Sequence, residues 1–340
     1  MSTVTPKSPA LPWKARLFLT TFTFAVDASR RSNGTINRFL SNFLDLKVSP
    51  SKKPINGVTS LDVTVDPSRN LWFRLYIPAA EVSGSHVSLP VIIFFHGGGF
   101  AFLAADSKPS DDFCRRLAGE LRAVVVSVNY RLSPEHRYPC QYEDGFDVLK
   151  FVDERGFDEF LPVNADLSRC FLAGDSAGSN LAHHVAVKVG GYDQLREVKV
   201  IGLMAIQPFF GGEERTESEM KLVGMPIISV ERTDWLWKAF LPEGADRDHP
   251  VVNVFGPKSA DISGVKFPAT VVFVGGFDPL QDWQKRYYEG LKKSGKEVHL
   301  IEYPNATHGF YAFQEFPESS LLITELRAFL EKQSAKKSMI

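Results

Sequence analysis

Hydrophobic residues near the N-terminus recur at helical spacing, which predicts two helices before the first strand. The first covers residues 12–31 and carries apolar side chains on or near one face: Trp13, Leu17, Phe18, Phe22 and Ala25. The second follows the turn Asn33-Gly34 and has apolar residues at the i, i+3, i+4, i+7 and i+8 positions of 36–44. Two apolar-faced helices must cover something, so we interpret them as either a packing arm or a lid over a pocket.

From residue 59 onwards the pattern changes to that of strands. Segments 61–65 and 71–77 alternate apolar and polar residues, as half-exposed antiparallel strands do. Six later runs are apolar on both faces, which is typical of parallel strands buried between helices: 91–95, 124–128, 170–173, 200–206, 271–274 and 298–303. Helical patterns separate most of these runs, for example at 111–120, 141–153 and 180–189. The chain is therefore predicted to form an α/β fold with an eight-stranded, mostly parallel sheet flanked by helices.

Residues 211–264 break this rhythm between the sixth and seventh predicted strands. Because Trp235, Trp237 and Phe240 lie in this stretch, we interpret it as a helical cap inserted at the carboxyl edge of the strands. No internal repeat, low-complexity block or linker divides the chain. We therefore expect one structural domain, with an N-terminal helical lid over 1–50 and a core over 51–340 that carries the cap.

A serine flanked by glycines follows the fifth predicted strand. Residues 174–178 read Gly-Asp-Ser-Ala-Gly, which is the G-x-S-x-G pattern of a nucleophile elbow. An elbow needs small neighbours because the serine sits on a strained strand-to-helix turn. The pattern also arises by chance in glycine-flanked turns, but here a buried strand precedes it and a helical pattern follows. The helix would also direct its positive dipole end toward a developing oxyanion.

A run of glycines follows the third predicted strand, where residues 96–100 read His-Gly-Gly-Gly-Phe. Glycines let the backbone approach a ligand closely, so the N–H groups of Gly98 and Gly99, with that of Ala177, are candidates for an oxyanion hole. A phosphate-binding loop is the alternative. However, no Lys-Ser/Thr pair follows, and the glycine spacing of nucleotide-binding folds is absent.

The candidate base and acid also follow strands. Of the eight histidines, only His308 lies in a loop just past the last strand, at the edge where doubly wound sheets bind ligands. Asp278 directly follows the seventh strand, whereas its rival Asp282 falls within the next helix. The chain order Ser, Asp, His is the one expected of hydrolases built on this kind of sheet. We predict that Ser176 is the nucleophile, His308 the general base and Asp278 the residue that orients it.

Composition and charge exclude several other classes of function. The net charge is −1 and no basic stripe occurs, so nucleic acid is not an expected partner. The three cysteines lack metal-binding spacing and fit a reducing compartment. Residues 17–26 resemble a secretory signal, but they contain threonines, lack a cleavage site and are too short to span a bilayer. A glycan on the sequon at 305–307 would lie against His308, so we expect a cytoplasmic protein, with the nucleus as a further location.

Three segments of the chain resemble the hormone-sensitive-lipase-like branch of the α/β-hydrolases: the glycine run at 96–100, Asn-Tyr-Arg-Leu-Ser-Pro-Glu at 129–135, and the elbow at 174–178. Within that branch the chain is similar to the plant carboxylesterases nearest the soluble gibberellin receptors, through residues 30–35, 211–219 and 237–242. The similarity covers nearly the whole chain. It includes the N-terminal helices, which form the hormone-gated lid in those receptors. The resemblance thus implies an α/β-hydrolase fold with a helical cap.

The chain departs from the receptors at positions that matter for their function. The receptors have a valine where this chain has His308, and a serine where it has Gly99. The lid tyrosine that contacts the hormone corresponds to Val26, and a second hormone-contacting tyrosine corresponds to Ser110. An Asp-Arg pair of the receptors reads Arg-Thr at 232–233. The resemblance therefore implies a catalytic relative that lacks most of the polar contacts to the hormone.

We accordingly predict a serine carboxylesterase that hydrolyses esters of small apolar molecules and needs no cofactor or metal. The candidate pocket residues are Phe22, Val26, Phe100, Asp175, Trp237 and Tyr311, although cap packing explains the aromatic ones equally well. Two alternatives stay open. One is a gibberellin-receptor-like binding protein whose lid recruits a protein partner. The other is a dehydratase of the same family that uses the same oxyanion loop to eliminate water.

Overall fold

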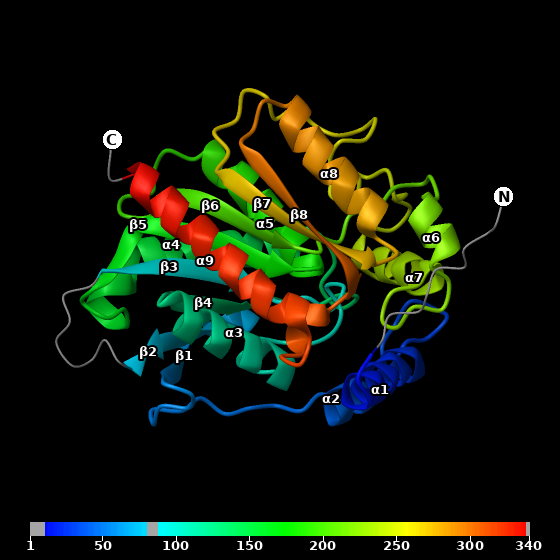
Figure 1. The fold of residues 1–340 in the computed structure, drawn as a ribbon, viewed down its shortest axis with the longest axis horizontal. Coiled ribbons are helices and arrows are strands. Elements are labelled where there is room, and N and C mark those ends of the chain that lie inside the picture. The colour runs from blue at the N-terminus through cyan, green and yellow to red at the C-terminus, as the bar shows by residue number, and fades with distance from the viewer. Residues whose placement is uncertain (1–10, 80–87, 338–340) are drawn as a thin grey trace.

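Eight strands form one sheet at the centre of the described structure, a computed structural model that covers residues 11–79 and 88–337. The strand order is β1-β2-β4-β3-β5-β6-β7-β8 (Figure 1). The strands are β1 Val58–Asp66, β2 Leu71–Pro78, β3 Leu89–Phe95, β4 Val124–Asn129, β5 Ala165–Asp175, β6 Val200–Ile206, β7 Ala269–Phe277 and β8 Val298–Thr307. β1 pairs antiparallel with β2, and β2 pairs antiparallel with β4. The remaining pairs are parallel, as the apolar runs predicted.

Burial along the strands follows their position in the sheet. All seven residues of β3 are buried because this strand lies between β4 and β5 under helices on both faces. The prediction that β2 is half-exposed is wrong, since only Trp72 and Ile77 are partly exposed. The reason is that β2 is not at the edge of the sheet, and α3 and α4 pack on it. Only β1 and β8 are edge strands of this sheet.

Two layers of helices enclose the sheet. One layer contains α4 Cys140–Glu159, α5 Ala177–Gly190 and α8 Gln281–Lys293. The other contains α3 Lys108–Leu121 and α9 Pro317–Lys337, and α9 crosses the front of the sheet in Figure 1. Each layer closes its own hydrophobic core. The parallel strands therefore present their carboxyl ends together at one edge, where loops are free to build a site.

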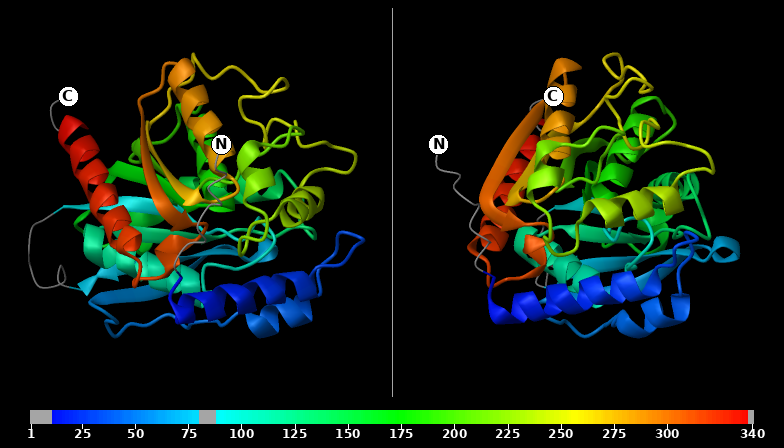
Figure 2. Two further views of the ribbon diagram at one scale, coloured as in Figure 1. Left: turned by 45° about the vertical axis from the view of Figure 1, so that its right-hand side comes forward. Right: turned by 90° about the vertical axis from the view of Figure 1, so that its right-hand side faces the viewer.

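The N-terminal segment forms α1 Trp13–Ser29 and α2 Arg38–Leu44, which lie side by side along one end of the molecule (Figure 2). The predicted inner face of α1 is partly wrong. Ala15 and Leu19 are buried, whereas Trp13 and Leu17 are 71% and 60% exposed. On α2 the large Phe39 is likewise 84% exposed. Because α1 is apolar on most of its circumference, spacing alone could not identify the stripe that packs inward. Residues 1–10 of the predicted lid lie outside the described residues.

The predicted cap at 211–264 contains two short helices, α6 Glu217–Lys221 and α7 Val230–Phe240, and otherwise irregular chain. It is thus less helical than predicted. The side chain of Asn180 on α5 anchors it, because its Nδ2 donates to the carbonyl oxygens of Phe209 and Val251 at 3.0 and 2.8 Å. Trp237 of α7 stacks on Phe209 with ring centroids 4.0 Å apart. The cap is therefore joined to the helix that begins at the candidate nucleophile.

Among the described residues, no helix is long and apolar enough to cross a membrane. All three cysteines have free thiols. In the same part of the chain, no group of three or more His, Cys, Asp or Glu side chains is arranged to hold a metal ion.

Candidate active site

Ser176 occupies a sharp turn between β5 and α5. Its backbone has φ 51° and ψ −116°, a strained conformation for a residue other than glycine. The turn needs glycine on both sides: a Cβ on Gly174 would lie 2.3 Å from the carbonyl carbon of Gly178, and one on Gly178 would lie 1.9 Å from the Phe95 oxygen. This is the geometry that the G-x-S-x-G pattern predicted.

His308 and Asp278 lie next to each other although they are 30 residues apart in sequence. Each directly follows a strand, β8 and β7 respectively, and these strands are neighbours. The distance from His308 Nδ1 to Asp278 Oδ2 is 2.7 Å, and neither side chain is more than 4% exposed. The rival Asp282 instead accepts a hydrogen bond from the Ser218 N–H of the cap at 2.8 Å. The structure therefore pairs the predicted base with the predicted acid.

Three other groups compensate the burial of the Asp278 carboxylate. Its Oδ2 accepts hydrogen bonds from Gln207 Nε2 at 3.0 Å and Gln284 Nε2 at 2.8 Å. Its Oδ1 accepts one from the Leu280 N–H at 2.9 Å. A buried carboxylate without such donors would be strongly destabilising. The same donors fix the direction of the lone pair that faces His308.

The glycine loop lies opposite these groups. Gly98 and Gly99 have φ values of +101° and +62°, and both line the same cavity as Ser176 and His308. A Cβ on Gly98 would lie 2.2 Å from the carbonyl oxygen of Phe102, so this position requires glycine. Ala177 is the first residue of α5, and its N–H is one of the unpaired donors of that helix terminus. Of the three predicted oxyanion donors, Gly98 and Gly99 thus line the cavity of Ser176, and Ala177 directly follows the serine.

His96, at the start of the same loop, is a structural residue. Its Nδ1 lies 2.8 Å from the Gly97 carbonyl oxygen, and its ring stacks on Tyr130 with centroids 4.2 Å apart. Burial lowers the pKa of His96 to about 4, so its ring is neutral at physiological pH. It does not line the cavity of Ser176. His86, another of the eight histidines, lies outside the described residues.

Asp175 ties the glycine loop to the nucleophile turn. Its Oδ1 accepts a hydrogen bond from the Gly97 N–H at 2.8 Å, and its Oδ2 accepts one from the Tyr311 hydroxyl. Burial raises the pKa of the Asp175 carboxyl to about 6, although both hydrogen bonds act in the opposite direction. The carboxylate form, which holds the Gly97 N–H, therefore predominates above about pH 6.

The serine and the histidine line a cavity of about 100 Å³. A second cavity of about 80 Å³ adjoins it and shares Phe22, Asp175 and Tyr311 with it. Apart from the polar Asp175, Tyr311 and Ser110, the walls of the second cavity are mostly aromatic and aliphatic side chains: Phe18, Leu19, Phe94, Pro109, Phe113 and Phe313. The site therefore offers two small, mainly apolar compartments next to Ser176.

Comparison with known proteins identifies the family of this chain. A sequence profile of the alpha/beta hydrolase fold matches residues 92–312. The gibberellin receptor GID1C of Arabidopsis thaliana is 45% identical over 334 residues, which cover 95% of each chain. This chain is an α/β-hydrolase.

Its relatives and structural neighbours include both receptors and esterases. Carboxylesterase 20 of Arabidopsis thaliana is 39% identical to this α/β-hydrolase over 275 residues, covering 78% of this chain and 83% of its own. Among solved structures, a hyperthermophilic esterase of the archaeon Pyrobaculum calidifontis superimposes with a TM-score of 0.72 at 26% identity, covering 95% and 99% of the two chains. The predicted resemblance to the plant branch of hormone-sensitive-lipase-like hydrolases is thus confirmed.

Helix α1 of the α/β-hydrolase covers the cavity. Phe22, Thr23 and Val26 all line it, and the Thr23 hydroxyl accepts a hydrogen bond from the Ile227 N–H of the cap at 3.1 Å. This placement favours a lid over a mere packing arm. Of the other predicted pocket residues, Asp175 and Tyr311 also line the cavity.

Two predicted pocket residues do not line either cavity. Phe100 is fully buried and stacks on Phe240 at 4.0 Å, and Trp237 stacks on Phe209. Both belong to an aromatic cluster through which the cap packs on the rest of the protein. Their aromatic character and their position near the motifs predict a place in the pocket, but composition cannot distinguish a pocket wall from the packing behind it.

An ion pair connects the lid to the cap. Arg232 Nε and Nη2 donate to the two carboxylate oxygens of Asp27 at 2.8 and 2.6 Å, and Arg232 itself lines the cavity. The hydrogen bond from Arg232 holds the pKa of Asp27 below its ordinary value, against the effect of burial. A lowered folded-state pKa means that this pair stabilises the closed lid above about pH 4 and is lost as pH falls through the lowered value. The pair is therefore intact at neutral pH, and it neutralises the arginine.

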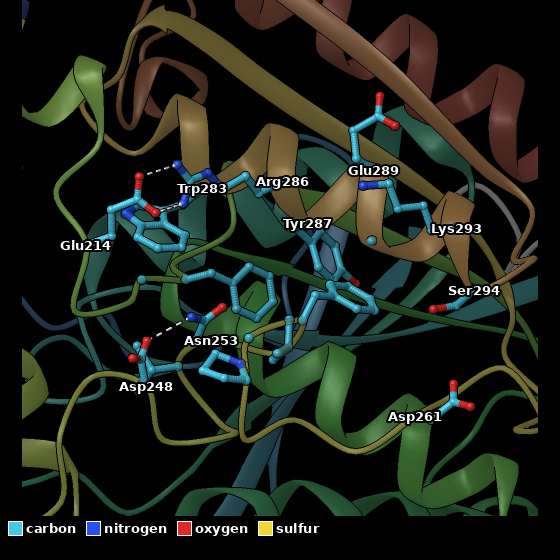
Figure 3. Close-up of a pocket in the computed structure, with 18 of the residues that line it drawn as sticks. Glu214, Asp248, Asn253, Asp261, Trp283, Arg286, Tyr287, Glu289, Lys293 and Ser294 are labelled. Atoms are coloured by element: carbon cyan, nitrogen blue, oxygen red, sulfur yellow. Dashed lines mark hydrogen bonds and ion pairs between the residues drawn. The ribbon is translucent and has the colours of Figure 1, made fainter.

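A larger cavity, of about 790 Å³, lies between α8 and the loop 248–263 of the α/β-hydrolase (Figure 3). Two contacts connect polar groups of its wall: Arg286 donates to Glu214 at 2.8 and 3.0 Å, and Asn253 Nδ2 donates to Asp248 at 2.9 Å. Its lining residues include no histidine. It therefore lacks the combination of serine, histidine and acid found at the smaller cavity, so cavity size does not identify the candidate site here.

Sequence reasoning missed several residues of the site. Gln207 and Gln284 hold the acid, and Ile227, Ile228 and Leu236 of the cap line the cavity. Gln207 directly follows β6, so its position at the carboxyl edge was a usable signal. The cap residues carried no signal, because their contact with the cavity depends on how an irregular segment folds over the sheet.

Proposed function

We propose that this α/β-hydrolase is a serine carboxylesterase that acts on esters of small apolar molecules. The observation that carries the proposal is the buried His308–Asp278 pair at 2.7 Å, beside a strained serine in the same cavity. Gibberellin receptors among its relatives share the fold, so the fold alone does not distinguish catalysis from binding. The carboxylesterases among the relatives support the catalytic alternative.

In the proposed reaction, Ser176 Oγ attacks the ester carbonyl carbon while His308 Nε2 accepts the hydroxyl proton. The N–H groups of Gly98, Gly99 and Ala177 donate to the oxyanion that forms. The intermediate collapses to an acyl-enzyme, and His308 gives its proton to the departing alcohol. His308 next removes a proton from water, which attacks the acyl carbon. The carboxylic acid then leaves as the acyl–Oγ bond breaks, and His308 returns the proton to Ser176 Oγ. Asp278 stabilises the imidazolium in both halves without taking the proton.

The cavities restrict the substrate. An engineered cavity of about 150 Å³ accommodates a benzene molecule, and each compartment here is smaller, at about 100 and 80 Å³. The walls are mainly apolar and the one cavity-lining arginine is neutralised by Asp27. We therefore propose uncharged esters with a short acyl chain.

Turnover of p-nitrophenyl esters of increasing acyl length tests this proposal. We expect kcat/KM to be highest for acetate or butyrate and to fall for decanoate. The products should be acid plus alcohol. Turnover of no ester in the series would contradict the proposal, and products that show loss of water instead of hydrolysis would favour the dehydratase alternative.

A substitution in the lid helix α1 tests whether this helix contributes to substrate binding. Phe22→Ala removes a ring that lines both cavities, and we expect KM for p-nitrophenyl butyrate to rise roughly tenfold because lost apolar contact is worth about 1–2 kcal/mol. Phe24→Ala is the matched control, since Phe24 is on the same helix but 69% exposed. Steady-state kinetics measure KM for both variants, and we expect the rise only in Phe22→Ala. Equal KM values for the two variants would reduce α1 to a packing arm.

Receptor function is the second candidate, favoured by the 45% identity to a gibberellin receptor and by the lid over the cavity. Val26 and Ser110 line the two compartments at the positions that match hormone-contacting tyrosines. A hormone hydroxyl left unpaired costs about 1–3 kcal/mol. Two such losses would weaken binding by roughly 10²-fold or more.

We therefore expect no high-affinity gibberellin binding. Isothermal titration calorimetry, with the Arabidopsis thaliana receptor as positive control, measures this directly. Binding as tight as that of the control, without turnover of any ester, would replace the esterase proposal with the receptor function.

A further inference from the structure

The side chain of Gln207 contacts the residues on both sides of the proposed base, His308. It also contacts the proposed acid, Asp278. Its Nε2 donates to Asp278 Oδ2 at 3.0 Å and to the Thr307 carbonyl oxygen at 3.1 Å. Its Oε1 accepts a hydrogen bond from the Gly309 N–H at 2.8 Å. Thr307 and Gly309 are the two neighbours of His308. One fully buried amide group thus holds the backbone before the histidine, the backbone after it, and the carboxylate that the histidine faces.

The backbone beside Gln207 also holds the nucleophile turn. The Ser176 N–H donates to the Ile206 carbonyl oxygen at 2.9 Å, and the Phe209 N–H donates to the Ser176 carbonyl oxygen at 3.0 Å. The Gln207 N–H is itself bonded to the Phe273 oxygen of β7 at 2.9 Å. The segment 206–209 is therefore hydrogen-bonded to Ser176, to Asp278 and to the two neighbours of His308.

Gln207 is held in a conformation that a free chain would avoid. Its φ is +45°, in the left-handed region that a residue with a Cβ rarely adopts. Such strain persists where surrounding contacts over-determine it, and it concentrates at functional sites. In this conformation the side chain extends toward the 307–309 loop while the main chain leaves β6.

We infer that Gln207 is a positioning residue that fixes His308 in register with Asp278 and Ser176 for the hydrolysis proposed above. The inference rests on that proposed function. No member of the triad follows β6. The residue directly after this strand, Gln207, nevertheless supplies the group that aligns the ends of β7 and β8. Catalytic groups must be held within about 0.5 Å and 10–20° of the productive geometry. The end of an edge strand and the two residues after it do not achieve this by themselves, because β8 is paired on one side only.

Gln284 provides the matched control. Its Nε2 donates to the same Asp278 Oδ2 at 2.8 Å, and its Oε1 has no hydrogen-bond partner among the described residues. Gln207 and Gln284 therefore satisfy the carboxylate alike, but only Gln207 is hydrogen-bonded to the loop that carries His308. If satisfying Asp278 were the whole role of Gln207, substitution of either glutamine would have the same effect.

The experiment compares Gln207→Leu, Gln207→Glu and Gln284→Leu in the full chain with p-nitrophenyl acetate. We expect Gln207→Leu to lower kcat by about 10- to 100-fold with KM nearly unchanged, because a displacement of about 1 Å at a catalytic group costs up to about 10²-fold. The far-downfield proton resonance of the His308 Nδ1–H should broaden or shift in this variant. Gln284→Leu removes one donor to Asp278 but no contact with the backbone beside His308, so its kcat should fall clearly less than that of Gln207→Leu and its resonance should stay in place.

Gln207→Glu has nearly the same shape and keeps the acceptor for the Gly309 N–H, so it carries the test if Gln207→Leu does not fold. Its carboxyl group cannot donate both to Asp278 Oδ2 and to the Thr307 carbonyl oxygen, so it loses contacts that the amide makes there. We expect kcat to fall by about 10-fold or more with KM nearly unchanged, and the downfield resonance to shift. A residue that only supports the fold would leave this resonance in place.

The possible outcomes distinguish a failure of the positioning role of Gln207 from a failure of the proposed esterase function. If wild-type protein is active but Gln207→Leu matches Gln284→Leu in kcat and keeps the downfield resonance, the positioning role is wrong. A wild-type kcat and an unshifted resonance in Gln207→Glu contradict it too. If the wild type hydrolyses no ester, the proposed function has failed before the role of Gln207 arises.

Discussion

Replacement of Ser176 or of His308 by alanine is expected to lower kcat for short-chain aryl esters by about 10⁴-fold or more. The serine variant lacks the nucleophile, and the histidine variant lacks the group that removes its proton. Because the two act as one unit, the double variant should lose little more than either single variant. Steady-state kinetics of the three proteins, each checked for folding by its melting temperature, measure the effect.

His299→Ala serves as the control for the histidine variant. His299 lies on the same strand, β8, but its side chain is 42% exposed and distant in sequence from the loop. This variant should keep near wild-type activity. Ester turnover by Ser176→Ala at the wild-type rate would show that a different group performs the chemistry.

Asp278→Asn is expected to lower kcat by about 10³- to 10⁴-fold, as the loss of the orienting acid does in serine proteases. Both oxygens of this carboxylate accept hydrogen bonds, from His308 Nδ1, two glutamine amides and the Leu280 N–H. An asparagine must therefore direct its own NH₂ group at donors whichever way it is turned. The least costly response is a change of histidine tautomer, which places a proton on Nε2 and prevents it from accepting one from Ser176.

The matched control for this variant is Asp282→Asn. Asp282 lies four residues further along the chain, and its carboxylate holds the Ser218 N–H of the cap instead of a histidine. Its substitution should leave kcat within a few fold of the wild type. If the two variants lose activity equally, Asp278 has no special part in the reaction.

Much of the sheet could be predicted because strands buried on both faces leave a continuous apolar run. The run at 200–206 coincides with β6, and the strands that precede Ser176, Asp278 and His308 were all predicted. The site followed from the same logic, since the carboxyl ends of parallel strands meet at one edge. Residue type then reduced the candidates to one serine, one acid and one histidine.

The parts that could not be predicted depend on three-dimensional packing. Leu17 and Leu19 are both leucines on one helix, yet the first is exposed and the second buried, because α1 is apolar around most of its surface. Phe22 lines the cavity whereas Phe100 lies behind its wall. Gln207 belongs to no motif, and its importance appears only when β6, β7 and β8 are placed side by side.

The most direct measurement of the central claim is covalent labelling with paraoxon, an organophosphate that phosphorylates an activated serine. We predict that intact-mass spectrometry shows one diethyl phosphoryl group per wild-type chain, that peptide mapping places it on Ser176, and that ester turnover is lost in step with labelling. Ser176→Ala should take up no label, and His308→Ala should react far more slowly. A wild-type protein that remains unlabelled and hydrolyses no ester, or that is labelled at another residue, would contradict the account.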